Sequence, residues 1–292
     1  MIISIASGKG GTGKTTLAVN LALSLAPEKP VCFMDCDVEE PNAHLFLRPS
    51  IENSSKVTVP IPIVDEEKCN GCKKCGEICA FNAILPLMEN HVLTFPELCH
   101  GCGGCTLLCP TGAISEHPLE IGVVEWGTAG QIFHVQGKLN IGSPLAPPIV
   151  DEVKKHRENM PNDTVFIVDA PPGTSCPVVA SVKDTDYCIL VTEPTPFGLH
   201  DLMLAVEMVK KLEIDFGVVI NRAGFGDERI VNYCNAKGIP VLTKIPFKRE
   251  YARCYAKGGR LIEEFPELQK TLKELWSSIS VSIKDGSIAK PL

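Results

Sequence analysis

The sequence predicts an α/β protein with a doubly wound, mostly parallel sheet, interrupted by a small cysteine-rich domain. Short apolar runs alternate with helical segments along most of the 292 residues, which is typical of parallel strands joined by right-handed crossovers. Eight of the 14 cysteines fall between Cys69 and Cys109. We therefore expect one discontinuous α/β domain at 1–59 and 117–283, and an inserted domain at 60–116.

The first elements define a strand–helix–strand unit. Residues 2–7 are an apolar strand, residues 15–25 form a helix with leucines at every fourth position, and residues 31–35 form the next strand. Residues 57–62 are poor helix material, and residues 119–141 resemble a hairpin around 127–130. Further strands are expected at 165–169, 187–192, 216–221 and 241–245, and further helices at 149–157, 199–212 and 228–236.

Composition excludes several classes of protein. With 45% hydrophobic and 22% charged residues the chain can bury a core, and a net charge of −7 argues against binding nucleic acid through bulk positive charge. No apolar run approaches the ~18 residues of a membrane span. A phosphate-loop pattern begins at Gly8, which leaves no room for a signal peptide, so we expect a cytoplasmic protein with no membrane or nucleic-acid partner.

The C-terminal part is expected to end in a packed helix and a tail. Apolar residues recur at a helical period, while the polar face carries four glutamates against two lysines. An acidic helix is a poor ligand for anionic lipid, so this face is interpreted as core packing. The apolar residues are Leu261, Phe265, Leu268, Leu272, Leu275, Trp276 and Ile279. Residues 284–292 are expected to be disordered.

Residues 8–16 read GKGGTGKTT and match the phosphate-binding pattern G-x-x-x-x-G-K-[ST]. The pattern follows a predicted strand and opens a predicted helix, where backbone N–H groups and the helix N-terminus favour phosphate. Lys14 is expected to reach the β- and γ-phosphates, and Thr15 to bind Mg²⁺. The predicted nucleotide-binding residues of this loop are Gly8, Gly10, Gly11, Thr12, Gly13, Lys14, Thr15 and Thr16.

Lys9 adds a second lysine to this loop, and the pattern K-G-G-x-G-K-[ST] resembles the deviant Walker A motif. That motif is shared by MinD-type ATPases, Mrp-type carriers and the nitrogenase iron protein. The resemblance implies a P-loop NTPase fold, Mg²⁺-dependent ATP hydrolysis and a homodimer in the ATP state. It also implies that Lys9 acts in trans on the nucleotide of the partner subunit.

Other positions match the same superfamily. By resemblance, Asp37 positions the attacking water and Asp35 lies near the magnesium shell. Asp169 would hold Mg²⁺ through water, Gly173 would sense the γ-phosphate, and Asn221 would hydrogen-bond adenine. Lys9, Lys14 and Asp37 are the implied catalytic residues.

The inserted segment contains a repeat of 30 residues, each copy reading C-x2-C-x2-C-x3-C. It resembles the two-cluster bacterial ferredoxins, in which the fourth cysteine ligates the other cluster. The resemblance implies a small α+β ferredoxin-like domain with two 4Fe-4S clusters. One would be held by Cys69, Cys72, Cys75 and Cys109, and the other by Cys99, Cys102, Cys105 and Cys79. The alternative is zinc, although zinc ribbons use two separate C-x2-C pairs.

The two motif sets together resemble MinD-superfamily ATPases with an inserted ferredoxin domain. This implies an ATPase, slow and coupled to electron transfer between a donor and an acceptor that the sequence does not identify. An Mrp-type iron–sulfur carrier is the alternative, although the C-x-x-C pair of those carriers is missing here. A MinD-type positioning ATPase is favoured less. Cys176 lies where the nitrogenase iron protein has a cluster ligand, and both an inert and a redox role remain open.

Overall fold

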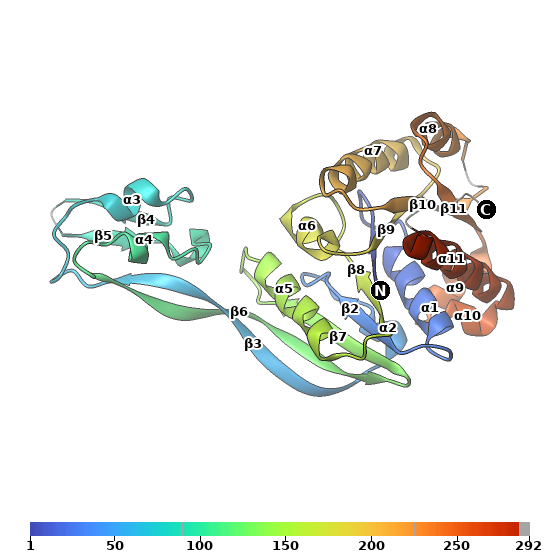
Figure 1. Cartoon of the computed structure of the whole chain (residues 1–292), viewed down its shortest axis with the longest axis horizontal. Coiled ribbons are helices and arrows are strands. Elements are labelled where there is room, and N and C mark those ends of the chain that lie inside the picture. Colours follow the sequence, from blue (N-terminus) through green and yellow to red (C-terminus); the bar gives the residue numbers. More distant parts are fainter. Residues whose placement is uncertain (89, 225, 286–292) are drawn as a thin grey trace. The chain divides into compact units, whose positions relative to one another are not determined.

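The computed structural model describes residues 1–88, 90–224 and 226–285, which form two compact units (Figure 1). The larger unit comprises Met1–Ser54, Val124–Lys138 and Val150–Leu292, and the smaller comprises Ser55–Val123 and Leu139–Ile149.

The larger unit is built on a parallel sheet. Its strands are β1 (Ile2–Ala6), β2 (Val31–Asp35), β7 (Ile132–Leu139), β8 (Val165–Asp169), β9 (Tyr187–Thr192), β10 (Phe216–Ala223) and β11 (Val241–Pro246). They lie in the order β11-β10-β9-β1-β8-β2-β7, and each neighbouring pair is parallel. This order confirms the predicted α/β class, because short βα connections carry the chain outward from a central β1 in both directions.

Helices cover both faces of this sheet. They are α1 (Lys14–Leu25), α2 (His44–Leu47), α5 (Pro147–Lys155), α6 (Cys176–Val182), α7 (Pro196–Lys211), α8 (Arg229–Lys237), α9 (Arg249–Ala256), α10 (Leu261–Glu264) and α11 (Pro266–Asp285), with a 3-10 turn η2 (His156–Asn159) after α5. Alternate residues of β9 face opposite sides: Tyr187 and Ile189 join the core containing α1 and α11, whereas Cys188 and Leu190 join the core containing α6 and α7. Two cores on one sheet define the doubly wound arrangement.

Helix α11 is part of the core, as its apolar period predicts. Leu272, Leu275 and Ile279 are fully buried in the same cluster as residues of α1. The helix continues through Asp285, two residues into the expected tail, and 286–292 lie outside the described residues. Within the described ranges, none of the helices combines the length and apolarity that crossing a bilayer requires.

Two long strands, β3 (Ser50–Val64) and β6 (Ile114–Ala129), carry the chain between the units. They are neighbours in the sheet and run antiparallel, because the start of β3 at Ser50 approaches Gly127 while Lys56 pairs with Glu120 at 2.7 Å. A turn at Gly130 then joins β6 to β7. The domain boundaries expected near 60 and 116 therefore fall inside extended strands rather than in loops.

The smaller unit repeats its backbone conformation every 30 residues. Its elements are α3 (Lys74–Ile78), β4 (Ile84–Pro86), β5 (Val92–Thr94), the 3-10 turn η1 (Pro96–Leu98) and α4 (Gly104–Leu107), with β4 antiparallel to β5. Left-handed backbone positions recur in pairs, namely Gly71 with Gly101, Lys73 with Gly103, and Asn82 with Gly112.

The two repeats also hydrogen-bond in an equivalent, crossed manner. The N–H of Asp65 donates to the carbonyl of Ala113 at 2.8 Å, and the N–H of Phe95 donates to the carbonyl of Ala83 at 2.8 Å. Asp65 and Phe95 are 30 residues apart, as are Ala83 and Ala113. The start of the first copy thus pairs with the end of the second copy, and the start of the second copy pairs with the end of the first. Neither copy is therefore complete alone.

Candidate nucleotide site and cysteine-lined cavities

The glycine-rich loop connects β1 to α1 at the carboxyl edge of the sheet, and two close approaches explain its glycines. Gly13 precedes α1 with φ of 96°, and a Cβ there would lie 2.3 Å from the side-chain nitrogen of Asn221. A Cβ on Gly8 would lie 2.1 Å from the carbonyl oxygen of Asp201 in α7. Only glycine fits at either position, because the loop packs directly against neighbouring elements.

Several hydrogen bonds hold this loop in place. The Asn221 amide donates to the carbonyl of Thr12 at 2.7 Å, and the N–H of Gly173 donates to the carbonyl of Ser7 at 3.0 Å. The Ser7 hydroxyl in turn donates to the carbonyl of Lys9 at 2.6 Å. Asn221 and Gly173, expected to contact adenine and phosphate, here hold the loop from the ends of two other strands.

Three carboxylates and one ammonium gather below the loop. Lys14 is buried, and its charge interacts with Asp169 and Asp37. Burial lowers the pKa of Lys14, raises that of Asp169 to about 7, and raises that of Asp37 to about 6. Asp35 is fully buried, and burial together with Asp169 raises its pKa well above the usual range. Full ionisation of the three carboxyl groups would place more negative charge here than Lys14 can neutralise, so without a bound cation the site favours their protonated forms.

The residues expected to bind Mg²⁺ fit a hard cation. Both carboxylate oxygens of Asp169 are buried with no close hydrogen bond in the described structure, although the Thr15 hydroxyl is near enough to lower the pKa of this carboxyl; the hydroxyl of Thr12 is likewise buried without a partner. Buried oxygen atoms without donors are costly, and a divalent cation with its water shell would satisfy them. Asp35 is used differently: it accepts from the N–H of Asp37 at 3.2 Å and of Ala43 at 3.1 Å, which fixes the segment after β2.

A cavity of about 300 Å³ opens beside the loop. Gly11, Gly13 and Thr16 line its loop side, and Asn221 lines another wall. The remaining lining includes residues that the sequence did not indicate: Arg222, Pro246, Phe247, Lys248, Tyr251 and Tyr255. Its aromatic and apolar walls next to a phosphate loop suit a nucleoside. The signal that could have pointed to these residues is their position at or just beyond the carboxyl ends of β10 and β11, at the ligand-binding edge of an α/β sheet.

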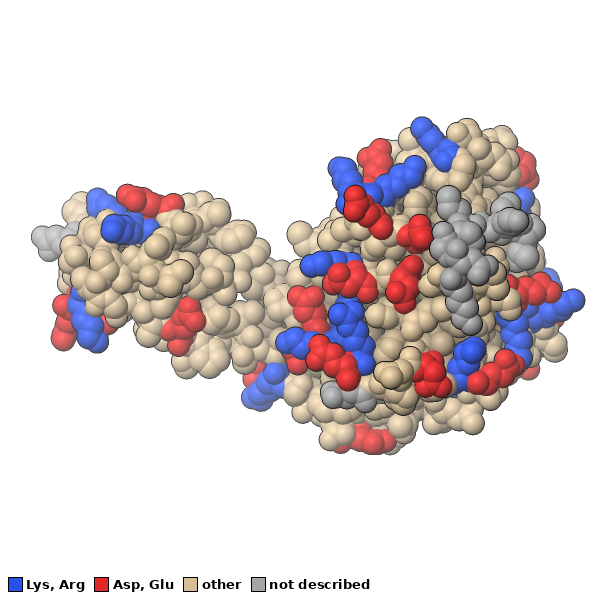
Figure 2. Space-filling model, viewed as in Figure 1, with Lys and Arg blue, Asp and Glu red and all other residues tan. Residues whose placement is uncertain are grey.

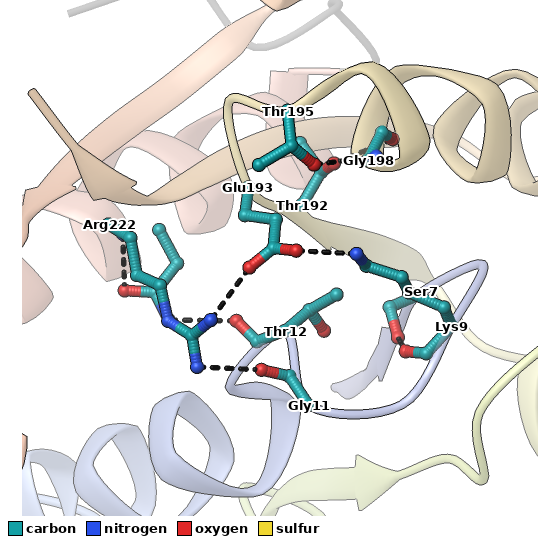
Figure 3. Close-up of polar contacts among 10 residues, drawn as sticks. Ser7, Lys9, Gly11, Thr12, Thr192, Glu193, Thr195, Gly198 and Arg222 are labelled. Atoms are coloured by element: carbon teal, nitrogen blue, oxygen red, sulfur yellow. Dashed lines mark hydrogen bonds and ion pairs between the residues drawn. The ribbon is translucent and has the colours of Figure 1, made fainter. Parts of the chain in front are cut away.

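Lys9 forms an ion pair that the sequence did not predict. Its ammonium lies 2.5 Å from Oε1 of Glu193, and Nη1 of Arg222 donates to Oε2 of the same carboxylate at 2.8 Å (Figure 3). Nη2 of Arg222 also donates to the carbonyl of Gly11 at 3.1 Å. Glu193 follows β9, so these residues converge only because the ends of β1, β9 and β10 meet at one edge of the sheet.

The eight clustered cysteines line two separate cavities of the smaller unit. One cavity is lined by Cys69, Cys72, Cys75 and Cys109. The other is lined by Cys79, Cys99, Cys102 and Cys105. Each cavity draws three cysteines from one copy of the repeat and the fourth from the other copy, which follows from the crossed backbone pairing.

Backbone N–H groups are aimed at several of these sulfurs. The N–H of Ala83 donates to Sγ of Cys79 at 3.2 Å, and the N–H of Ala113 donates to Sγ of Cys109 at 3.3 Å. Such bonds stabilise thiolates, the form that ligates iron. Among the described residues, no three cysteine, histidine or carboxylate side chains converge on one point as ligands of a single metal ion would. Four thiols with backbone N–H donors nearby are the donor chemistry that an iron–sulfur group uses.

Comparison with known proteins agrees with this fold and loop. Residues 3–262 match the CbiA family, the CobQ/CobB/MinD/ParA nucleotide binding domain. The chain belongs to this family. It is a P-loop ATPase of the MinD/ParA type, and its relatives include uncharacterized protein MJ0579 of Methanocaldococcus jannaschii, 30% identical over 94% of this chain and 96% of that protein.

More distant relatives carry functional names. An iron-sulfur cluster carrier protein of Methanocaldococcus jannaschii is 26% identical over 93% of this chain and 83% of its own length. Among solved structures, the septum site-determining protein MinD of Pyrococcus horikoshii, complexed with Mg-ADP, aligns with a TM-score of 0.59 at 21% identity, covering 95% of each chain. At this identity the structural likeness shows the fold alone.

The six cysteines of this P-loop ATPase outside the repeat divide by exposure. Five are buried in the larger unit: Cys32, Cys36, Cys188, Cys234 and Cys254. Burial raises the pKa of each of these thiols, as is typical of cysteines that pack in a core. Cys176 is exposed at the start of α6, seven residues after Asp169.

Proposed function

We propose that this P-loop ATPase is an ATP-switched homodimer that couples slow ATP hydrolysis to electron transfer through two 4Fe-4S clusters. The observation that carries the proposal is the division of eight cysteines into two cavities of four, each completed by a cysteine from the other copy of the repeat. When bound, a 4Fe-4S cluster supplies reversible one-electron transfer at a potential tuned by hydrogen bonds to its sulfurs.

The cysteines that would hold each cluster are the two crossed sets. Cys69, Cys72, Cys75 and Cys109 would hold one, and Cys99, Cys102, Cys105 and Cys79 the other. The N–H donors at Ala83 and Ala113 would stabilise the two thiolates that cross between the copies. Electrons would enter from a reduced donor protein and leave to an oxidised acceptor.

The nucleotide site supplies the switch. Lys14 would neutralise the β- and γ-phosphates, while Thr15 and Asp169 would hold Mg²⁺, the latter through water. Asp37 would orient the attacking water; at a pKa of about 6 its carboxyl is mostly ionised at pH 7. Asp35 anchors the segment that carries Asp37, and the chain enters β3 from α2 soon after it. Movement of this segment therefore has a short covalent route to the smaller unit.

The dimer would form with ATP held between two subunits, and Lys9 would reach the partner's nucleotide. Light scattering coupled to size exclusion tests this directly. We expect a dimer with MgATP, a monomer with MgADP, and a monomer in both states for Lys9→Ala. Lys155→Ala is the control. Lys155 also pairs with a glutamate, at 2.7 Å, but it lies on α5 and not in the phosphate loop. This variant should dimerise as the wild type does.

The deciding measurement for electron transfer is the reduction potential of the clusters with MgADP and with MgATP. A shift between the two nucleotide states supports coupling. Identical potentials in the two states contradict it, whatever the rate of ATP hydrolysis.

An iron–sulfur carrier of the Mrp type is the second candidate, favoured by the 26% identical cluster carrier protein and by the exposure of Cys176. It predicts transfer of a cluster to apo-proteins that depends on Cys176. Transfer that Cys176→Ser abolishes, combined with nucleotide-independent potentials, would favour the carrier. A positioning role of the MinD type is less favoured, because the apolar face of α11 is used in the core.

A further inference from the structure

Glu193 is the common partner of two cations that belong to different parts of the nucleotide site. It binds the ammonium of Lys9 through one oxygen and the guanidinium of Arg222 through the other (Figure 3). The Glu193 side chain is only 12% exposed, against 30% for Lys9 and 47% for Arg222. A charge pair shielded on one side in this way is stronger than an exposed surface pair.

The backbone around Glu193 is held firmly. Its carbonyl accepts from the N–H of Thr195 at 2.8 Å, and Thr195 caps α7 by accepting from the N–H of Gly198 at 2.9 Å. A Cβ on Gly198 would lie 2.1 Å from the Glu193 carbonyl oxygen, so the turn between β9 and α7 leaves no room for adjustment. The carboxylate is therefore a fixed point to which the Lys9 side chain is drawn.

Arg222 links this point to the nucleotide cavity. Its guanidinium spans from Glu193 to the carbonyl of Gly11, and the residue lines the cavity beside the loop. Its backbone φ of 53° is a left-handed conformation that is unfavourable for a non-glycine residue. A strained arginine held between a loop carbonyl and a carboxylate is well placed to respond when a nucleotide enters.

We propose that Glu193 is a positioning residue that retains Lys9 within its own subunit until ATP binds, with Arg222 steadying the carboxylate. This inference rests on the proposed function, in which Lys9 acts in the partner's site. A lysine bound to Glu193 at 2.5 Å cannot at the same time extend to a second subunit. The γ-phosphate supplies the competing negative charge that draws Lys9 away, whereas ADP lacks that group, so Glu193 sets how much ATP the dimer requires.

Glu193→Gln tests the inference, since it keeps the shape of the side chain and removes its charge. We expect the MgATP concentration at half-maximal dimerisation to fall at least about fivefold, the lower end of typical coupling between sites, while MgADP affinity of the monomer stays within about twofold. Glu193→Asp, whose shorter carboxylate cannot reach both cations, should give a smaller fall and covers the case in which Glu193→Gln folds poorly. Glu152→Gln breaks an exposed glutamate–lysine pair on α5 and should change nothing.

The results that would contradict the role of Glu193 can be told apart from those that would contradict the trans role of Lys9. If Glu193 only braces the loop through Arg222, Glu193→Gln weakens MgADP binding and does not lower the midpoint, which overturns the inference. An unchanged midpoint, in a chain that Lys9→Ala renders monomeric, overturns the role of Glu193 and leaves the proposed function intact. If Lys9→Ala dimerises at the same MgATP concentration as the wild type, the trans role of Lys9 is wrong. The retention of Lys9 by Glu193 is then wrong as well.

Discussion

The two units of this chain hold their predicted ligands in opposite ways. In the larger unit the phosphate loop rests on a sheet with a large apolar core on each face. In the smaller unit helices α3 and α4 bury none of their residues. Among the described residues, twelve of the twenty exposed large apolar side chains belong to the smaller unit. In Figure 2 its charged side chains lie in separate groups around an uncharged area.

The difference indicates where the folding free energy of each unit comes from. The larger unit can fold by burying apolar surface, so its nucleotide site is formed before the nucleotide binds. The smaller unit has about 80 residues and little core, close to the size at which small domains commonly rely on disulfides or metals for stability. The nucleotide site is therefore expected to survive loss of its ligand, and the cysteine cavities are not.

Removing iron with a chelator under anaerobic conditions should produce the largest difference in stability between the two units. Residues 55–123 should become sensitive to protease, because ligand binding there is also folding energy. Both tryptophans, Trp126 and Trp276, lie in the larger unit, so intrinsic fluorescence reports on that unit alone. We expect the fluorescence to stay native; parallel loss of both signals would mean that the units do not fold separately.

Lys14→Ala should damage only the nucleotide site. The buried ammonium would make charge-assisted hydrogen bonds worth about 1.5–3 kcal/mol each, so nucleotide affinity should fall about 100-fold or more. Iron and sulfide content should match wild type. Calorimetric titration with MgADP measures the first quantity and chemical analysis the second, and a drop in iron would show coupling that the separate cores do not predict.

Cys109→Ser should show that the copies of the repeat are interlocked. Cys109 belongs to the second copy but shares a cavity with Cys69, Cys72 and Cys75. We expect the variant to lose about four of about eight irons per chain, and Cys69→Ser/Cys109→Ser to lose no more. Cys176→Ser, outside both cavities, should keep all of them. Full loss in Cys69→Ser/Cys109→Ser, with half loss in each single variant, would contradict the crossed sets.

The smallest expected effect is a decrease in the stability of the larger unit as pH rises. The folded chain without ligands raises the pKa of Asp169 to about 7, against roughly 3.9 when unfolded, so between these values the folded state binds the extra proton. Stability contributed by Asp169 is therefore greatest at low pH and declines as pH rises through 7, by about 1 kcal/mol between pH 6 and 8.

Urea unfolding followed by tryptophan fluorescence, without Mg²⁺ or nucleotide, measures this decline. Asp37, with a pKa of about 6, adds to it in the same direction. Asp35, whose pKa is also raised by burial, adds to it as well, so Asp169→Asn should reduce the slope without abolishing it, whereas Asp163→Asn, an exposed control, should leave it unchanged. Saturating MgADP should also flatten it, since a cation beside Asp169 stabilises the carboxylate; a steeper slope with MgADP would argue against a role of Asp169 near Mg²⁺.

Local sequence predicted the strands that carry the site almost residue by residue. The runs at 31–35, 165–169 and 187–192 coincide with β2, β8 and β9, because buried parallel strands are continuous apolar segments bounded by polar residues. The ends of the insertion were harder to predict. β3 and β6 are alternating or proline-containing strands that run beyond the cysteines, and no glycine-rich break marks where one unit stops.

The phosphate loop, the parallel sheet around it and the repeated cysteine spacing can be predicted from consecutive residues, because each residue type in these patterns has one main use. Which distant residues meet depends on the folded chain. The pairing of Asp65 with Ala113 and of Phe95 with Ala83 interleaves the two cysteine copies. The convergence of three strand ends brings Glu193 and Arg222 to Lys9. The crossing of the cysteine sets is expected only through the resemblance to ferredoxins, and the meeting of Glu193 with Lys9 leaves no local pattern, since both depend on contacts between different segments of the chain.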